Sequence, residues 1–178
     1  MKDTRRSKVL ILIMTALFSA SAYANEEREN IIFLGAGPAE KGNSLKNSDP
    51  PFSIGYIRTT KGSETVWGFD ISGEGTMLDS TWGQSRALSQ GTSYNFLYGK
   101  NLTKSTSFRL DALLLVGLRE KVAACPRSYI GYQCYANTQP DTSYAGNVGA
   151  IAAISYERMT LGLRVTAESK QALMGFRF

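Results

Sequence analysis

The chain contains two cysteines and no histidine. Cys125 and Cys134 lie close together in a polar, aromatic stretch. In an oxidising compartment this spacing predicts a local disulfide, which would restrict the unfolded chain by roughly 2.5 kcal/mol. A structural metal site is the alternative, but such sites need further cysteine or histidine ligands, and there is no second cysteine pair. We therefore predict a disulfide between Cys125 and Cys134, and no metal site.

The lack of histidine also limits the reactions that the chain could catalyse. A serine nucleophile would need a lysine or an N-terminal amine as its base. No Gly-x-Ser-x-Gly elbow is present, and Ser85 and Ser128 fall in segments typical of loops. Gly35 and Gly37 resemble a dinucleotide-binding loop, but the third glycine is misplaced and no helical pattern follows. We expect no enzymatic activity and no cofactor; a lipid-modifying reaction through Asp and Tyr side chains is the catalytic alternative.

Charged residues in the apolar segments occupy alternate positions, and the clearest case begins at Phe108. One alternate set there is apolar, and the other holds every charge. The first set is Phe108, Leu110, Ala112, Leu114, Val116 and Leu118, and the second is Arg109, Asp111, Leu113, Leu115, Gly117 and Arg119. This two-residue period predicts a β-strand. An amphipathic helix fits less well, because Arg109 and Asp111 do not match a helical stripe and Gly117 weakens it.

The first 24 residues have the three regions of a secretory signal peptide. A basic segment, Met1–Lys8, precedes an apolar run, Val9–Phe18, and small residues follow with an Ala-x-Ala pattern ending at Ala24. The apolar run is shorter than the ~20 residues of a transmembrane helix. We therefore predict export, with cleavage between Ala24 and Asn25 and a mature domain over residues 25–178.

Removal of the signal peptide would lower the net positive charge of the chain. The sequence has 20 basic and 15 acidic residues, of which the signal contains four and one, so 16 and 14 remain in the mature chain. This small net charge does not favour a nucleic-acid partner. The mature length suits one domain and is too short for a large porin.

The last strand points to a membrane protein. Phe178, Phe176 and Met174 share one face, and Arg177 lies on the other. An apolar face toward lipid and a polar face toward a lumen is the pattern of a transmembrane barrel. The segment resembles the final strand of bacterial outer-membrane β-barrel proteins, which typically ends in Phe. The resemblance implies that Phe178, Phe176 and Met174 form the signal read by the barrel-assembly machinery.

The rest of the mature chain divides into eight segments with alternating side chains. They are Asn30–Gly37, Phe52–Thr60, Thr65–Gly73, Thr92–Gly99, Phe108–Arg119, Tyr144–Tyr156, Leu161–Ala167 and Ser169–Phe178. Long connections follow the first, third and fifth segments, and short ones follow the second, fourth and sixth, as in a barrel with long outer loops and short periplasmic turns. The short connection at Ser169 departs from this order and predicts a low wall on that side of the outer rim.

The alternation assigns side chains to the two faces of the wall. Trp67, Phe108, Leu161 and Phe176 are expected to face lipid. The residues expected to face the lumen as a network of salt bridges and hydrogen bonds are Asp70, Arg109, Asp111, Arg164 and Arg177. We place Arg109 and Arg177 toward the periplasmic end. An eight-stranded barrel is narrow enough for side chains to fill, so we expect a closed interior, with an ion path as the alternative.

The segment Lys121–Ser143 is expected to be the longest loop. Tyrosines beside the cysteine pair could form a recognition surface, because tyrosine offers a large contact area at little entropy cost. The candidates are Arg127, Tyr129, Tyr132 and Tyr135. The alternative is that these tyrosines belong to the aromatic girdle or pack the base of the loop.

Together these features predict an all-β protein, an eight-stranded antiparallel up-and-down transmembrane β-barrel similar to the small OmpA/OmpX-like barrels. A soluble periplasmic β-sandwich is the alternative fold. The expected role is structural or adhesin-like, and a small pore is the alternative. A lipid-modifying enzyme is less favoured, because the outer-membrane barrel hydrolases that this chain resembles in architecture rely on a histidine base, and the chain has no histidine. We expect a cell outer membrane location, contacts with lipid, lipopolysaccharide and the assembly machinery, a possible host or surface ligand, and a monomer.

Overall fold

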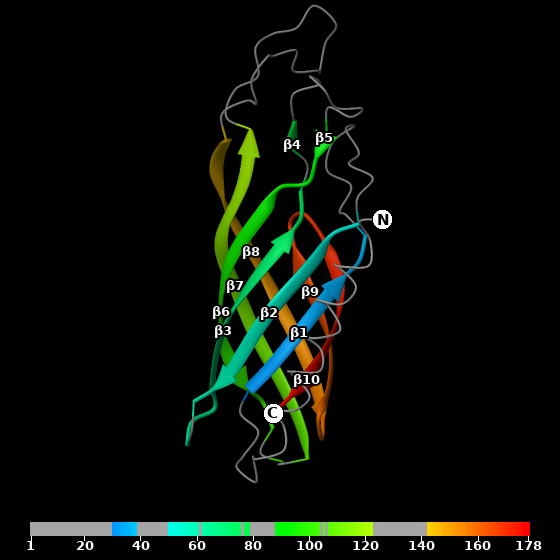
Figure 1. Ribbon diagram of the computed structural model, residues 1–178. Helices are drawn as coiled ribbons and strands as arrows, with labels where there is room; N and C mark the ends of the chain where they lie inside the picture. Colours follow the sequence, from blue (N-terminus) through cyan, green and yellow to red (C-terminus); the bar gives the residue numbers. More distant parts are fainter. Residues whose placement is uncertain are drawn as a thin grey trace, which may run out of the picture.

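A computed structural model describes residues 30–38, 50–60, 62–75, 77–78, 88–103, 105, 107–122 and 142–178. Eight strands of this part close into one barrel (Figure 1). Their bounds are β1 Asn30–Ala36, β2 Phe52–Thr59, β3 Thr65–Gly73, β6 Thr92–Asn101, β7 Phe108–Val122, β8 Thr142–Tyr156, β9 Met159–Thr166 and β10 Lys170–Arg177. Two further strands, β4 Met77–Leu78 and β5 Leu88–Ser89, pair with each other above the barrel.

Every neighbouring pair in the barrel is antiparallel, in the order β1, β10, β9, β8, β7, β6, β3, β2. The first and last strands close the sheet, with Ile31 opposite Arg177 and Ala36 opposite Ala172. Closure leaves no free edge along this seam, so the backbone groups there are paired within the sheet. The fold class predicted from the sequence, a closed eight-stranded antiparallel β-barrel, is confirmed.

Side chains alternate between the two faces of the wall throughout. On β7, Leu114 and Val116 are 66% and 58% exposed, whereas Leu113 and Leu115 between them are 3% and 0% exposed. The same alternation places large apolar residues on the outside of all eight strands. Examples are Leu34, Ile54, Phe69, Phe96, Leu118, Val148, Leu163 and Met174. A surface this apolar is suited to hydrocarbon rather than to water.

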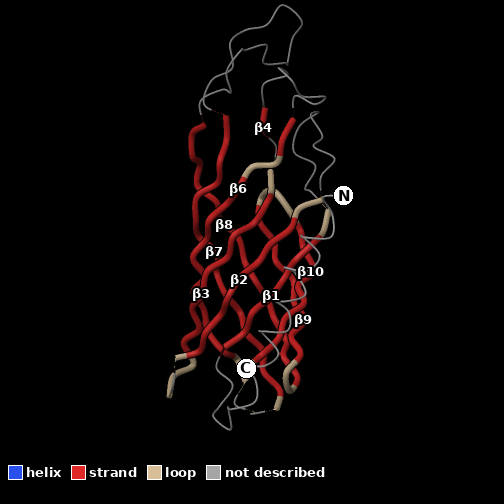
Figure 2. The backbone as a smooth tube through the Cα atoms, in the orientation of Figure 1, coloured by secondary structure: helices blue, strands red, loops and turns tan. Residues whose placement is uncertain are grey.

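The barrel wall has unequal height. β7 and β8 contain 15 residues each, whereas β9 and β10 contain eight each. β9 and β10 are joined by a tight turn in which the Thr166 N–H donates to the Ser169 carbonyl. Figure 2 shows β7 and β8 continuing past the other strands of the barrel at the end that carries the long connections. The predicted low wall at Ser169 is therefore present.

Ten buried apolar side chains point into the lumen and pack against one another. They are Ile31, Phe33, Ile57, Val66, Leu97, Leu113, Leu115, Ile151, Ala153 and Leu173. Phe33 occupies the space over Gly55, where an added Cβ would lie 2.2 Å from the ring. This packing explains why the first predicted strand is apolar on both faces: Leu34 is on the outside, and Ile31 and Phe33 point inward.

Some strand ends differ from those predicted. β7 continues to Val122 and β8 starts at Thr142, so both ends of the expected loop Lys121–Ser143 are strand. Polar residues there still pair across the hairpin, for instance Lys121 with Ser143. β9 begins at Met159, because the turn before it contains only Glu157 and Arg158. The expected loop Glu74–Gln90 contains the short ribbon of β4 and β5.

In the part of the chain that the structure describes, no helix is long and apolar enough to cross a membrane.

Candidate functional site

The lumen holds two groups of polar residues with the apolar side chains between them. The upper polar cluster contains Arg164, Asp70, Glu74 and the residues bound to them, near the end that carries the long connections. The lower polar cluster contains Arg109 and Asp111, near the short turns. The strand register sets this order, because Asp70 and Glu74 follow Val66 up β3, whereas Asp111 precedes Leu113 and Leu115 on β7.

Arg164 on β9 is the centre of the upper polar cluster and is fully buried. Its Nε donates to Asp70 Oδ2 at 2.7 Å, and its Nη1 and Nη2 donate to the Glu74 carboxylate at 2.8 and 2.9 Å. Nη2 also donates to Ser72 Oγ at 2.9 Å. A guanidinium can hold several acceptors at once because its donors lie in a fixed plane. Arg164 thus ties β9 to β3 across the barrel.

Glu74 accepts seven hydrogen bonds, although it lies just beyond the last residue of β3. Besides Arg164, the donors are Ser72, Ser93, Asn147, Thr166 and Ser169, which come from β3, β6, β8, β9 and the turn before β10. Burial would raise the pKa of the Glu74 carboxyl, but the hydrogen bond and charge of Arg164, with the bonds from Ser169 and Thr166, hold that pKa well below its ordinary value of 4.5. The carboxylate is therefore kept ionised.

Asn95 and Asn147 extend the upper polar cluster across the barrel. The Asn95 amide donates to Asp70 Oδ1 and to Ser93 Oγ, and the Asn147 amide donates to Asn95 Oδ1 at 2.8 Å. These side chains are buried and come from β3, β6 and β8. The cluster therefore closes the lumen with side chains bonded to one another.

The lower polar cluster is smaller. Arg109 Nε donates to Asp111 Oδ2 at 2.6 Å, and Asn101 Nδ2 donates to Asp111 Oδ1 at 2.9 Å. Ser155 and Thr160 share a hydrogen bond of 2.8 Å at the same end of the barrel. Arg177 is also buried there, at 8% exposed. Arg109 Nη2 has no hydrogen-bond partner among the described residues.

The five residues predicted for the lumen all point inward and are buried. They do not form one continuous network, because the apolar side chains separate Asp70 and Arg164 from Arg109, Asp111 and Arg177. Sequence reasoning missed Glu74, which it placed in a loop. The signal was present, because Asp70, Ser72 and Glu74 continue the two-residue period past the end of the strand.

The other predicted sites lie outside the described residues. These are the signal peptide over residues 1–24, the cysteines Cys125 and Cys134, and the loop candidates Arg127, Tyr129, Tyr132 and Tyr135. Phe178, Phe176 and Met174 are described, and Met174 is 61% exposed on the outside of β10. Phe178 follows β10 and exchanges two backbone hydrogen bonds with Asn30. Among the described residues no group of three or more potential metal ligands occurs.

No family model and no curated protein matches the chain. Among solved structures, the outer membrane protein Ail of Yersinia pestis in a phospholipid nanodisc is 17% identical, with a TM-score of 0.40, covering 85% of this chain and all of that one. A crystal structure of Ail, the attachment invasion locus protein of Yersinia pestis, is 14% identical, with a TM-score of 0.44, covering 86% of this chain and all of that one. The barrel itself is established by the strand pairing described above.

Proposed function

We propose that the chain is an integral barrel of a Gram-negative outer membrane, with a structural or surface-interaction role at the end that carries its long connections. The observation that carries the proposal is the filled interior. Ten apolar side chains and the upper polar cluster occupy the lumen, so the described residues leave no continuous polar lining for a solute. A function that depends on contact must therefore use the outside of the barrel or its ends.

The outer wall supports insertion in a bilayer. Large apolar residues occupy the outward positions of every strand, and the strands are tilted and close without a free edge along most of their length. The predicted signal peptide and the alternating Met174, Phe176 and Phe178 support export and assembly in the outer membrane. The tall β7–β8 hairpin would extend away from the membrane, and the sequence that joins its two strands, residues 123–141, contains the cysteine pair and the tyrosines.

Cell fractionation tests the location. The protein should appear in the outer-membrane fraction and should migrate differently on a gel before and after boiling, as folded barrels do. A compact monomer that stays in solution without detergent would overturn the proposal, because the exposed apolar wall would then have no hydrocarbon around it.

A binding assay tests the surface role. Deletion of residues 125–134 should reduce adhesion of expressing cells to host cells or serum proteins, whereas deletion of residues 40–48 from the first long connection serves as the matched control. Unchanged adhesion in the first variant would rule out the adhesin-like role. Cys125→Ser with Cys134→Ser then tests whether the loop must be closed by a disulfide.

A small pore is the second candidate function, and the feature that favours it is the polar cluster at each end of the lumen. The apolar side chains between the two clusters oppose an ion path, because a charge that passes them would lose its hydration without compensation. Planar-bilayer recordings should show no steady conductance. A steady conductance that Arg164→Ala alters would favour the pore.

A further inference from the structure

The outward positions of the strands carry four charged residues, and the two cations near the short turns lie on the same side of the barrel. Arg58 is on β2 and Lys100 is on β6, and both are exposed. The other outward charges, Glu120 and Lys170, lie at the opposite end of the barrel. Outward charge near the short turns is thus positive and confined to one sector.

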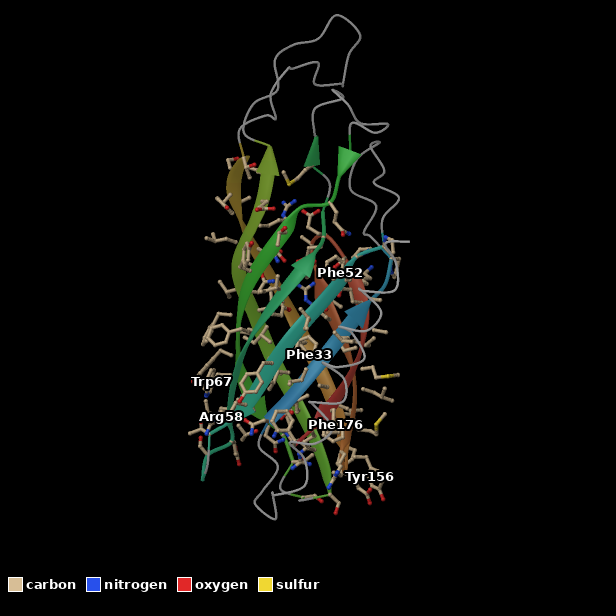
Figure 3. All side chains as sticks on the ribbon, in the orientation of Figure 1. Phe33, Phe52, Arg58, Trp67, Tyr156 and Phe176 are labelled. Atoms are coloured by element: carbon tan, nitrogen blue, oxygen red, sulfur yellow. The ribbon has the colours of Figure 1, made fainter. Side chains whose placement is uncertain are left out.

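β3 separates β2 from β6 and places Trp67 between the two cations. Arg58 is the cross-strand partner of Trp67, and Trp67 is the partner of Tyr98. Lys100 lies two residues closer to the short turns than Tyr98, and because the strands tilt, it is at about the height of Arg58. Two strand spacings and the two-residue offset along the strand separate their Cα atoms by about 12 Å, which their long side chains can span. Figure 3 shows Arg58 beside Trp67 on the outer wall.

Neighbouring polar groups complete this sector. Asn30 is the cross-strand partner of Arg58 on its other side, and its Oδ1 accepts a hydrogen bond from the Tyr56 hydroxyl. Among the described residues the amide nitrogen of Asn30 has no partner, so it can donate outward. Outward positions of β1, β2, β3 and β6 contain no acidic residue, and among the described residues neither Arg58 nor Lys100 has an ion pair. The nearest acid in the register is Glu64, in the turn below Thr65, whose carbonyl accepts a hydrogen bond from the N–H of Asn101, next to Lys100.

The surface above the cations is aromatic. Trp67 and Phe69 meet edge to face at 5.8 Å between ring centroids, and Phe69 and Phe96 meet at 5.4 Å. Tyr98 is 57% exposed beside them. Aromatic side chains with polar tips are common where hydrocarbon meets the headgroups. The sector therefore offers an apolar wall to an acyl chain and two cations to whatever anion lies below it.

The two cations lie at a depth where the barrel surface is apolar on its other side. Phe108, Tyr156 and Met159 extend the apolar surface of β7, β8 and β9 to the last residues before the short turns. Phe108 lies six positions below Leu114, which shares a registered row with Arg58. This row rises from Arg58 to Leu114 because the strands are tilted, but it rises by less than the six positions that separate Leu114 from Phe108. The two cations therefore lie at a depth where the outer surface of β7, β8 and β9 is still apolar. Arg and Lys side chains at this depth extend their charged ends to the headgroup region, where an anionic group stabilises them.

We propose that Arg58, Lys100 and Trp67 form a site for the headgroup of an anionic phospholipid in the leaflet at the short turns. The phosphate takes Arg58 and Lys100, with the Asn30 amide as a further donor, and an acyl chain lies along Trp67 and Phe69. This inference rests on the proposed membrane insertion, in which the short turns face the periplasm. Attraction of the two cations to anionic lipid gives a preference of about fivefold for each.

Quenching of Trp67 fluorescence by brominated lipids tests the site. Trp67 and Trp82 are the two tryptophans of the chain, so Trp82→Phe leaves Trp67 as the single reporter. The full mature Trp82→Phe protein is folded into phosphatidylcholine bilayers that contain a minor fraction of brominated phosphatidylglycerol or of brominated phosphatidylcholine. We expect several-fold stronger quenching by the anionic lipid. Arg58→Gln with Lys100→Gln should remove the preference, whereas Lys170→Gln at the other end should keep it.

The outcomes distinguish failure of the lipid site from failure of the proposed membrane insertion. Equal quenching by both lipids, or a preference that survives Arg58→Gln with Lys100→Gln, overturns the lipid site. Quenching by neither lipid means that Trp67 does not face hydrocarbon, which overturns membrane insertion itself. Heat-modifiable gel mobility checks that each variant folds. If the double variant does not fold, Arg58→Lys with Lys100→Arg must keep the preference, and high salt must reduce it in the Trp82→Phe protein.

Discussion

Arg164 and Glu74 are ninety residues apart in the sequence, yet their side chains meet across the lumen through hydrogen bonds of 2.8 and 2.9 Å. Both side chains are fully buried. A buried ion pair is no guarantee of a more stable protein than an apolar pair of the same size, because both charges lose their hydration. Removal of one partner alone destabilises the fold, because it leaves the other charge unpaired in a medium of low dielectric constant.

Glu74→Gln should lower the free energy of unfolding by about 3 kcal/mol. The substitution leaves Arg164 with Asp70 as its one carboxylate and turns amide hydrogens toward donors such as Thr166 and Ser169. Urea titration of the barrel in lipid vesicles measures the change. Glu64→Gln, in an exposed turn, is the control and should have little effect. In an Arg164→Met background the cost of Glu74→Gln should fall; equal costs in both backgrounds would mean that the two residues are not coupled.

The contribution of Glu74 should depend on pH in acid. The folded pKa of Glu74 lies well below 4.5, whereas the unfolded chain takes up its proton near 4.5. Above this value both states are ionised and the contribution is complete; below it the unfolded state binds the proton first, so the contribution declines toward the folded pKa. The difference in unfolding free energy between wild type and Glu74→Gln should be constant from neutral pH down to about pH 5.5 and should narrow below pH 4.5. A difference that widens in acid would contradict this assignment.

Phe33 and Leu34 are adjacent on β1 and test the two faces of the wall. Phe33→Ala should cost about 3 to 5 kcal/mol, because it leaves a cavity over Gly55 inside a lumen that cannot collapse around it. Leu34→Ala removes an outward side chain that is 60% exposed, and lipid can fill the space, so the loss should be clearly smaller. Urea midpoints in vesicles compare the two variants. Equal losses would mean that the lumen is less densely packed than described.

The β8–β9 turn contains a strained residue. Glu157 has a φ of 50°, in the left-handed region that non-glycine residues adopt at a cost. Asparagine tolerates this conformation better, so Glu157→Asn should stabilise the barrel by about 0.5 kcal/mol. Arg158→Asn, at the other turn position and without a positive φ, is the matched control. The temperature at which the folded gel band disappears should rise in the first variant alone. A similar rise in both variants would mean that the positive φ of Glu157 is not the cause.

The sequence by itself determined the eight strands and the face to which each side chain belongs. The period of two is local: Arg109 and Asp111 alternate with Phe108 and Leu110, and no other strand is needed to know that they lie on opposite faces. The same reasoning placed Asp70, Arg164 and Arg177 inside. It also extends to Glu74, once the period is followed past Gly73, because a strand can end before its side-chain alternation does.

Only the tertiary structure decided the height of each inward residue and hence its partners. Height depends on the register between tilted neighbouring strands, which accumulates around the closed barrel and cannot be read within one segment. This is why Arg164 meets Asp70 and Glu74 on the opposite side, whereas Arg109 meets Asp111 two positions along its own strand. The apolar side chains around Phe33 separate the two groups for the same reason. Register likewise brought Arg58 and Lys100 to one height on either side of Trp67.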